Sequence, residues 1–421
     1  MERGFPIAEF QTIRGMRDFL PEQAAKKQYI EGVCRLVFES YGFQPLETPA
    51  VEGFELLAKK GSGGEAIKDE IYYFKDKGDR ELGLRFDLTV PTARVVATNP
   101  NFQKPFKRYQ IAKVWRYDRP QAQRYREFTQ ADYDIFGPKG AMADFEIIAV
   151  TVDVLKKLGL KGKVVVNDRR ILEEFAEKNG VKKEQITDCF RSIDKLDKIG
   201  KDGVEKELKE KGINANILGQ LGMGLDKLEK EIPSSAALQD LKKVFALAKD
   251  AGIQEYVQFD LSLARGLEYY TGIVFEVKSG LGPSIGGGGR YDRLIETYGG
   301  RETPAIGSSF GIDRILDLLE KQLPAVQPAK VFIAAIGEEA AVESVKIAGK
   351  IRAQGIAVEV DLMGRNPSKN TEYADKKGIP FVAFIGEKEI SAKEFELKNL
   401  KTGKAVKLKF SEIGKVAEVL K

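Results

Sequence analysis

Four arginines lie within eleven residues in the stretch RYDRPQAQRYR, residues 116–126. A guanidinium group presents a planar fork of N–H donors that matches phosphate oxygens, so such a cluster suits a charge-dense polyphosphate. Arginines on a hairpin also pair with neighbouring carboxylates, and this loop by itself leaves both interpretations open. Glycine-rich phosphate loops of the GxxxxGK[ST] and GxGxxG types are absent from the chain.

Polar residues alternate in two further segments. Gln130, Asp132 and Asp134 follow the arginine-rich loop and would share one face of a strand. Buried carboxylates are costly without a polar partner, which favours a polar ligand on this face. Asp87 and Thr89, in LRFDLT, would also share one strand face and suit an ammonium group. An isolated pair of this kind more often marks the end of a strand, where the two side chains form hydrogen bonds with the backbone of the following turn.

A third group of polar residues occurs in LARGLEYYTGIVFE, residues 263–276. Arg265, Tyr269 and Tyr270 come just before a Val/Phe-rich strand, which would direct alternate side chains into a common pocket. Adjacent tyrosines in a strand point to opposite faces. We therefore expect only one of the two tyrosines to line the pocket directly and the other to lie in the core.

An antiparallel sheet must position these residues. Strands and glycine-rich strand segments are expected at 43–51, 71–74, 82–84, 107–115, 127–136, 259–277 and 286–291. Those at 107–115 and 127–136 would flank the arginine-rich loop as a hairpin. Amphipathic helices are expected at 21–40, 141–158 and 312–323.

The rest of the chain has a different character. Residues from 161 to about 255 are dense in Lys and Glu and predict an inserted helical part, and LPAVQPAK (323–330) predicts a linker. Strand and helix patterns alternate beyond it, which is typical of an α/β domain. This domain holds 17 Lys and Arg against 13 Asp and Glu, four of the five net positive charges. It suits a tRNA-reading attachment, although an ordinary solvated surface is the alternative.

Composition narrows the possible chemistry. None of the 421 residues is histidine, which excludes Ser-His-Asp triads and histidine-ligated metals. Cys34 and Cys189 are the only cysteines, which argues for a reducing compartment and against zinc or iron–sulfur clusters. The chain has no apolar run of about 18 residues and no secretory signal pattern at its start. We therefore expect a cytoplasmic protein without a membrane partner.

Taken together, these segments closely resemble the histidyl-tRNA synthetases, which are class II aminoacyl-tRNA synthetases, and more nearly their archaeal and eukaryotic branch. The matching stretches include RGMRDFLPEQ, LRFDLTVPTAR, KRYQIAKVWRYDRPQAQRYREFTQADYDIFG, LARGLEYYTGIVFEV, GGGRYDRLI and PAIGSSFGIDRIL. LARGLEYYTG together with GGGRYD distinguishes this family from the seryl, prolyl and threonyl relatives. The resemblance implies an α+β fold: a class II antiparallel-sheet catalytic domain (1–165 and 256–325), a helical insertion (166–255) and a C-terminal α/β anticodon-binding domain (329–421).

The resemblance also implies the reaction and its partners. L-Histidine and ATP would form histidyl-adenylate and pyrophosphate, and the histidyl group would then pass to tRNA(His). Mg²⁺ would accompany the pyrophosphate of ATP, with no metal ligands assigned in the chain, and the protein would be a homodimer.

Residue roles follow from the same resemblance. The catalytic arginines would be Arg116, on the α-phosphate, and Arg265, on the reacting carboxylate and phosphate. The ATP-binding residues would also include Arg124, Phe128, which would stack on adenine, and Arg314. The substrate-binding residues would be Asp87, Thr89 and Gln130 at the α-ammonium group, Asp134 and Tyr270 at the imidazole, and also Tyr269 and Tyr291.

A protein of another class is the main alternative. Some relatives of these synthetases bind histidine or uncharged tRNA as regulators without catalysis. Such proteins usually lose the arginine of the RYDRP loop, the arginine of LARGLEYY or the anticodon domain. This chain keeps all three, so we expect an enzyme.

Overall fold

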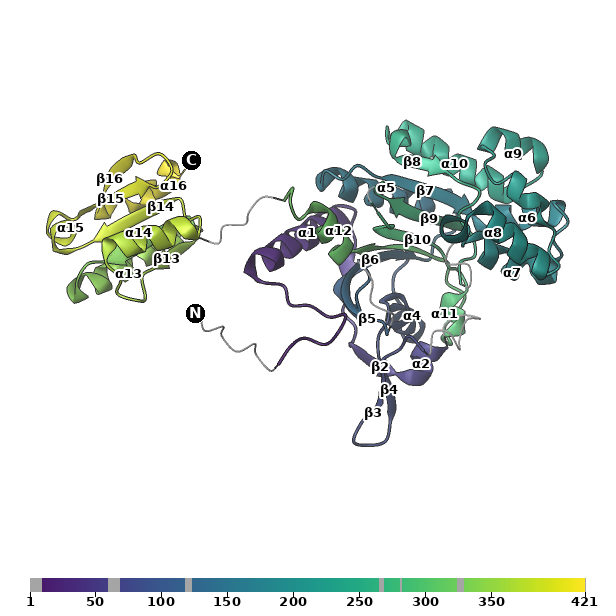
Figure 1. Ribbon diagram of the computed structural model, residues 1–421, viewed down its shortest axis with the longest axis horizontal. Coiled ribbons are helices and arrows are strands. Elements are labelled where there is room, and N and C mark those ends of the chain that lie inside the picture. The colour runs from purple at the N-terminus through teal and green to yellow at the C-terminus, as the bar shows by residue number, and fades with distance from the viewer. Residues whose placement is uncertain are drawn as a thin grey trace, which may run out of the picture. The chain divides into compact units, whose positions relative to one another are not determined.

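The computed structural model describes residues 10–59, 69–117, 123–264, 269–280, 282–323 and 329–420. Its contacts divide the chain into two compact units, Met1–Leu323 and Pro324–Lys421. Each unit has its own sheet and hydrophobic core (Figure 1). Most of the expected linker at 323–330 lies outside the described residues.

The larger unit is built on an eight-stranded sheet. In spatial order its strands are β1 (Gln44–Pro45), β5 (Phe106–Trp115), β6 (Glu127–Phe136), β11 (Ala305–Gly311), β10 (Gly286–Arg290), β9 (Ile273–Lys278), β7 (Lys163–Asp168) and β8 (Val257–Phe259). Neighbouring strands are antiparallel, except that β1 runs parallel to β5 and β8 runs parallel to β7 at the two edges. This organisation confirms the expected α+β class.

The hairpin expected around the arginine-rich loop is present. β5 and β6 pair along ten residues each, from Phe106 opposite Phe136 to Trp115 opposite Glu127. β11 pairs with the other edge of β6, so β6 is a central strand of the sheet. Its alternating side chains therefore have a fixed face, and the predictions at 107–115 and 127–136 are confirmed.

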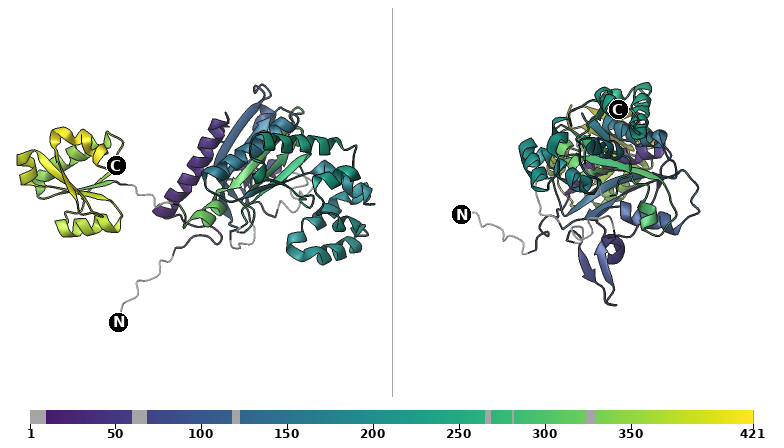
Figure 2. Two further views of the ribbon diagram at one scale, coloured as in Figure 1. Left: turned by 90° about the horizontal axis from the view of Figure 1, so that it is seen from above. Right: turned by 90° about the vertical axis from the view of Figure 1, so that its right-hand side faces the viewer.

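The helices that pack on this sheet include α1 (Pro21–Ser40), α5 (Ala141–Lys157) and α12 (Ile312–Leu319) (Figure 2). α1 buries Ile30, Cys34, Val37 and Phe38, which recur at helical spacing. It ends before Gly42, whose φ of +79° suits a glycine after a helix. The helices predicted at 21–40 and 141–158 are confirmed, and the one predicted at 312–323 ends four residues earlier.

The helical part of this unit starts later than the sequence suggested. Its helices are α6 (Arg169–Lys178), α7 (Ile186–Ile193), α8 (Leu196–Glu210), α9 (Leu225–Glu231) and α10 (Ala236–Asp250). The stretch from 161 was expected to be helical, but its first part is strand β7 of the large sheet. Three consecutive valines, Val164, Val165 and Val166, favour a buried strand because β-branched side chains fit a pleated sheet.

A small sheet lies beside the large one. It consists of β2 (Val51–Gly53), β4 (Glu81–Leu84) and β3 (Tyr73–Lys75), with helix α2 (Phe54–Ala58) after β2. The single strand predicted at 43–51 is wrong, since β1 and β2 belong to different sheets. The guanidinium of Arg85 donates to the carbonyls of Thr48 and Pro49, so these groups are satisfied outside a strand ladder.

A second correction concerns LRFDLT. The segment was expected to be a strand, but Thr89 begins helix α4 (Thr89–Thr98), which packs against α11 (Leu294–Thr297). Pro91 lies in the first turn of α4, where a missing N–H costs no helical hydrogen bond. Asp87 Oδ1 accepts a hydrogen bond from the Val90 N–H at 3.1 Å, at the start of that helix.

The smaller unit has the expected strand and helix alternation in its first half. Its sheet has the order β13 (Val358–Val360), β12 (Val331–Ala335), β14 (Phe381–Ile385), β15 (Glu394–Asn399) and β16 (Ala405–Lys409). The helices are α13 (Glu338–Arg352), α14 (Pro367–Lys376), α15 (Glu387–Ala392) and α16 (Val416–Val419). β12 is parallel to β13 and β14, whereas β15 and β16 add an antiparallel hairpin. No described helix combines the length and hydrophobicity that a membrane crossing requires.

Candidate active site

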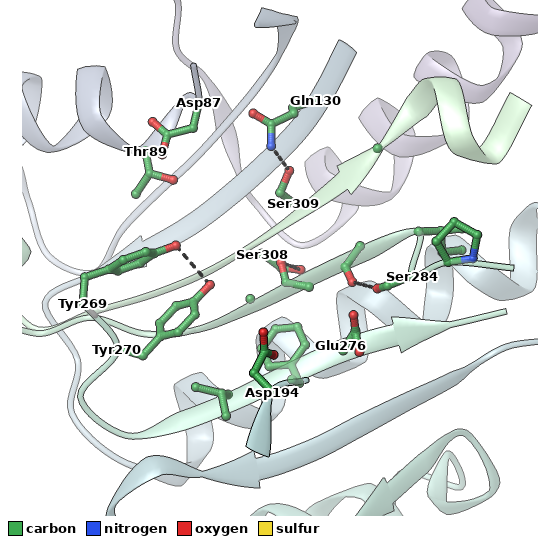
Figure 3. A pocket seen from close by; sticks show the side chains of 18 of the residues that line it. Asp87, Thr89, Gln130, Asp194, Tyr269, Tyr270, Glu276, Ser284, Ser308 and Ser309 are labelled. Atoms are coloured by element: carbon green, nitrogen blue, oxygen red, sulfur yellow. Dashed lines mark hydrogen bonds between the residues drawn. The ribbon is translucent and has the colours of Figure 1, made fainter. Parts of the chain in front are cut away.

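A cavity of about 1150 Å³ opens in the larger unit (Figure 3). Eleven of the twelve residues to which the family resemblance assigns a role line it: Asp87, Thr89, Arg116, Arg124, Phe128, Gln130, Asp134, Tyr269, Tyr270, Tyr291 and Arg314. They come from β6, α4, α12 and the segments between elements, so the fold gathers distant parts of the chain. The twelfth, Arg265, lies outside the described residues.

Glycines form part of the cavity lining. Gly307 on β11 is opposite Asp134 in the sheet, and a Cβ at this position would overlap Asp134 Oδ1. A Cβ at Gly288 on β10 would overlap the Gly307 carbonyl. Glycine is therefore needed at 307 because the Asp134 carboxylate crosses directly over its backbone.

One end of the cavity is an ordered acidic site. Arg108 on β5 is opposite Asp134 in register, and its Nη2 forms an ion pair with Asp134 Oδ2. The Tyr291 hydroxyl donates a hydrogen bond to Asp134 Oδ1. Burial and then the Asp134 charge raise the pKa of Tyr291 well above its usual value. The phenol thus stays protonated as a donor, and the carboxylate is fixed from two sides.

Asp132 adds a second buried carboxylate to this end. It is on the same face of β6 as Asp134 and also lines the cavity. Burial raises the pKa of Asp132 to about 7; the Arg108 charge opposes this shift, and the Asp134 charge reinforces it. Beside it, Gln130 Nε2 donates to Ser309 Oγ at 3.1 Å (Figure 3).

The two adjacent tyrosines correct a prediction. Strand alternation predicted only one in the pocket, whereas the family resemblance named both. Tyr269 and Tyr270 both line it, with their hydroxyls hydrogen-bonded at 3.2 Å (Figure 3). They precede β9 instead of belonging to it, so strand alternation does not apply. Burial raises the pKa of Tyr269, and the charges of Asp87 and Asp132 add to that shift. Tyr269 therefore lies close to both carboxylates.

Arginines also line the cavity. Arg116 Nε donates to the Phe86 carbonyl at 2.9 Å, and its guanidinium carbon lies 5.3 Å from the centre of the Phe128 ring. Arg314 on α12 donates to the Ser284 carbonyl at 2.7 Å. These contacts fix the two side chains, and each guanidinium has five N–H groups with which it can also donate to an anion. Arg124 also lines the cavity, and residues 118–122 of the loop lie outside the described residues.

The helical part supplies one wall of the cavity, and the basic residues of this wall were not predicted as site residues from the sequence. Arg191, Lys195, Lys198 and Lys211 line the cavity from α7, α8 and the residues that follow them. Glu207 accepts from Lys195 and Lys211 at 2.8 and 2.7 Å. No spacing rule in the sequence linked this stretch to the sheet.

The arrangement has a definite chemical character. Two buried carboxylates and three tyrosines suit a small cationic or N–H-bearing ligand, and the arginines of the same cavity suit phosphates. Among the described residues, no group of three or more Asp, Glu or Cys side chains is arranged to hold a metal ion. A single cavity can thus bind an amino acid and a nucleotide side by side.

Comparisons with known proteins agree with this geometry. A family model described as "Histidyl-tRNA synthetase" matches residues 15–315, and one described as "Anticodon binding domain" matches residues 330–420. A "Histidine--tRNA ligase 1" of Bacillus cereus is 37% identical over 96% of this chain and 99% of its own length. A "Histidine--tRNA ligase" of Pyrococcus furiosus is also 37% identical, over 96% of this chain and 97% of its own length. A bacterial and an archaeal protein are thus equally similar, and identity does not separate the two branches.

A solved structure extends the similarity to three dimensions. The crystal structure of histidyl-tRNA synthetase from Nostoc sp. PCC 7120 matches with a TM-score of 0.86 and 30% sequence identity. The match covers 98% of this chain and 99% of that one.

Proposed function

Because the chain belongs to the histidyl-tRNA synthetase family and attaches histidine to tRNA(His) with the use of ATP, we propose that the cavity of the larger unit holds histidine and ATP together. The observation that supports this most strongly is that buried carboxylates and arginines line one cavity. An amino acid placed between them would have its carboxylate beside the α-phosphate of ATP.

Asp134 and Tyr291 would recognise the imidazole ring. Imidazole has two nitrogens, and a ligand that offers no N–H at this place would bury the Asp134 carboxylate without the hydrogen bond that the ring donates. Arg108 and Tyr291 hold that carboxylate before the ligand arrives. Tyr270, together with Asp87, Thr89, Gln130 and Tyr269, would complete the histidine site.

Arg116 would stabilise adenylation. In this step a histidine carboxylate oxygen bonds to the α-phosphorus while pyrophosphate leaves, so no proton has to be transferred. Negative charge builds on the phosphorus oxygens, and a fixed guanidinium aimed at them lowers the barrier. We propose the same role for Arg265, by resemblance alone. Phe128 would stack on adenine, and Arg124 and Arg314 would contact the distal phosphates.

Mg²⁺ would enter with ATP. Magnesium in such sites is typically held by phosphate oxygens and waters with only one or two protein carboxylates. That mode fits described residues that offer no cluster of three or more metal ligands. The protein's own contribution to charge neutralisation would then come from its arginines.

We further propose a cytoplasmic homodimer, in which the smaller unit contacts the anticodon part of tRNA. The family resemblance implies the dimer, and α1 offers apolar surface, since Tyr29 and Leu36 are 44% and 67% exposed. Sedimentation analysis should give twice the chain mass of 46.8 kDa. A monomer at micromolar concentration would contradict the dimer.

Histidine-dependent exchange of pyrophosphate into ATP tests the proposed site. The wild type should exchange with histidine, and Arg116→Ala should reduce the rate by about 10²–10³. Arg94→Ala is the matched control, because Arg94 pairs with Glu52 at 2.7 Å and does not line the cavity. Binding of tRNA without any exchange would instead favour the regulatory alternative.

A further inference from the structure

Asp132 is a buried carboxylate without a dedicated cation. Asp132 is only 3% exposed, and it lines the cavity. Its Oδ1 has no hydrogen-bond partner among the described residues. A buried anion is costly unless a partner compensates it, so this carboxylate is suited to a group that comes from outside the chain.

The charged groups around Asp132 are engaged elsewhere. Arg108 pairs with Asp134, its neighbour across the hairpin. Arg85 donates to the carbonyls of Thr48, Pro49 and Lys113. Both guanidinium groups still interact with Asp132 through space, and the carboxylates of Asp134 and Asp87 repel it.

The uncharged neighbours of Asp132 do not neutralise it. Ser309, opposite it on β11, is its hydrogen-bond partner, and the Tyr269 phenol lies within its electrostatic reach. Because Arg108 balances Asp134, the negative charge of Asp132 remains at the acidic end, repelled by that of Asp87. One bound cation would relieve this repulsion.

We propose that Asp132 binds the α-ammonium group of histidine together with Asp87, while Asp134 binds the imidazole ring. This inference rests on the proposed function and adds a specificity residue to it. The carboxylates of β6 then have separate tasks. Asp134 has its own arginine and accepts from a neutral ring, whereas Asp132 has none of its own and takes the substrate's positive charge.

Two ligands, one with and one without the α-ammonium group, distinguish ammonium binding by Asp132 from ring binding by Asp134. Asp132→Asn keeps the shape of the side chain and removes a buried charge, so the fold should persist, as a melting curve will verify. Histidine and 3-(imidazol-4-yl)propionate are titrated into the wild type and the variant by calorimetry. We expect the variant to bind histidine about ten- to hundredfold more weakly. Its affinity for the propionate should change less than about threefold.

The controls make the outcome decisive. Glu52→Gln alters a buried carboxylate that is paired with Arg94 away from the cavity, and it should leave both affinities unchanged. If Asp132→Asn lost affinity equally for both ligands, Asp132 would be assigned to the ring and the proposal would be overturned. Unchanged affinity for histidine would also overturn it. Wild type that does not bind histidine would instead reject the proposed function itself.

The wild type alone provides an independent readout. Burial raises the pKa of Asp132 to about 7, so near neutral pH an ammonium ion that binds the carboxylate displaces a proton from its acid form. Calorimetry in buffers of different ionisation enthalpy gives the protons released by each ligand, and the ring protons that each free ligand carries at that pH are subtracted. The corrected release should be larger for histidine than for the propionate. Equal corrected release for the two ligands would overturn the proposal even if the variant failed to fold.

Discussion

Arg108 and Asp134 lie directly opposite each other on β5 and β6 and form an ion pair in which the arginine residue is 0% exposed. The pair is part of the hairpin that carries the arginine-rich loop, and Tyr291 reaches the same carboxylate from the end of β10. The acidic end of the cavity is therefore organised by the sheet before any ligand binds, which reduces the cost of ordering it later.

Loss of Arg108 should be severe. Arg108→Met leaves Asp134 buried without its cation, and removal of one partner of a buried pair costs about 3–5 kcal/mol. Chemical denaturation should show this loss in the free energy of unfolding. The double variant with Asp134→Asn should regain part of it, because the orphaned charge is gone. If the double variant were as unstable as the sum of the single changes, the pair would contribute nothing.

Asp132 should make stability depend on pH. Burial raises its pKa to about 7, so the folded state binds this proton more tightly than the unfolded state. Stability therefore falls as pH rises from about 4 to 7. At pH 8, Asp132→Asn should exceed the wild type in unfolding free energy by up to about 4 kcal/mol, and near pH 4 the two should agree. A difference independent of pH would contradict this assignment. Asp144, whose pKa burial raises to about 6, affects both proteins alike.

The Tyr291 hydroxyl should matter for catalysis. Tyr291→Phe removes the donor to Asp134 and should lower kcat/KM for histidine about ten- to hundredfold, since hydrogen bonds to charged groups are strong. Tyr298→Phe is the matched control. The Tyr298 hydroxyl is buried without a hydrogen-bond partner among the described residues, so its removal should leave kcat/KM nearly unchanged. Similar kinetics for the two variants would argue against a role for Tyr291.

A single methyl group should disable the acidic site. In Gly307→Ala the new Cβ overlaps Asp134 Oδ1, which must move away from Arg108 or Tyr291. Histidine-dependent pyrophosphate exchange should fall more than about tenfold, since small displacements at a reacting site are costly.

Gly349→Ala provides the control for this change. Gly349 lies on α13 with open space at its Cβ position, and alanine there should stabilise the helix by about 0.5–1 kcal/mol. Normal exchange in the Gly307 variant would show that the carboxylate can shift without consequence.

Sequence periodicity anticipated the hairpin because alternating polar and apolar residues define the faces of a central strand. It also placed Gln130, Asp132 and Asp134 on one face. Arg108 was not predicted as a site residue, because its partner Asp134 can be identified only when the register of β5 and β6 is known. The register depends on how the eleven-residue loop closes, and composition does not determine that.

Two other errors have local causes. Asp87 and Thr89 were assigned to a strand although Pro91 is well placed for the first turn of a helix. Tyr269 and Tyr270 were treated as strand residues, but they lie in the chain segment before β9, where neighbouring side chains can point the same way. In both cases the period-of-two rule was applied beyond the end of an element.

The glycine lining limits how substrate preference can be redesigned. Gly288 and Gly307 already have the smallest side chain, so substitution there can only shrink the space. Room for an amino acid bulkier than the natural one has to come from trimming aromatic walls such as Tyr269 and Tyr270. Engineers seeking to load tRNA with ring-extended analogues would therefore randomise those walls and leave the glycines untouched.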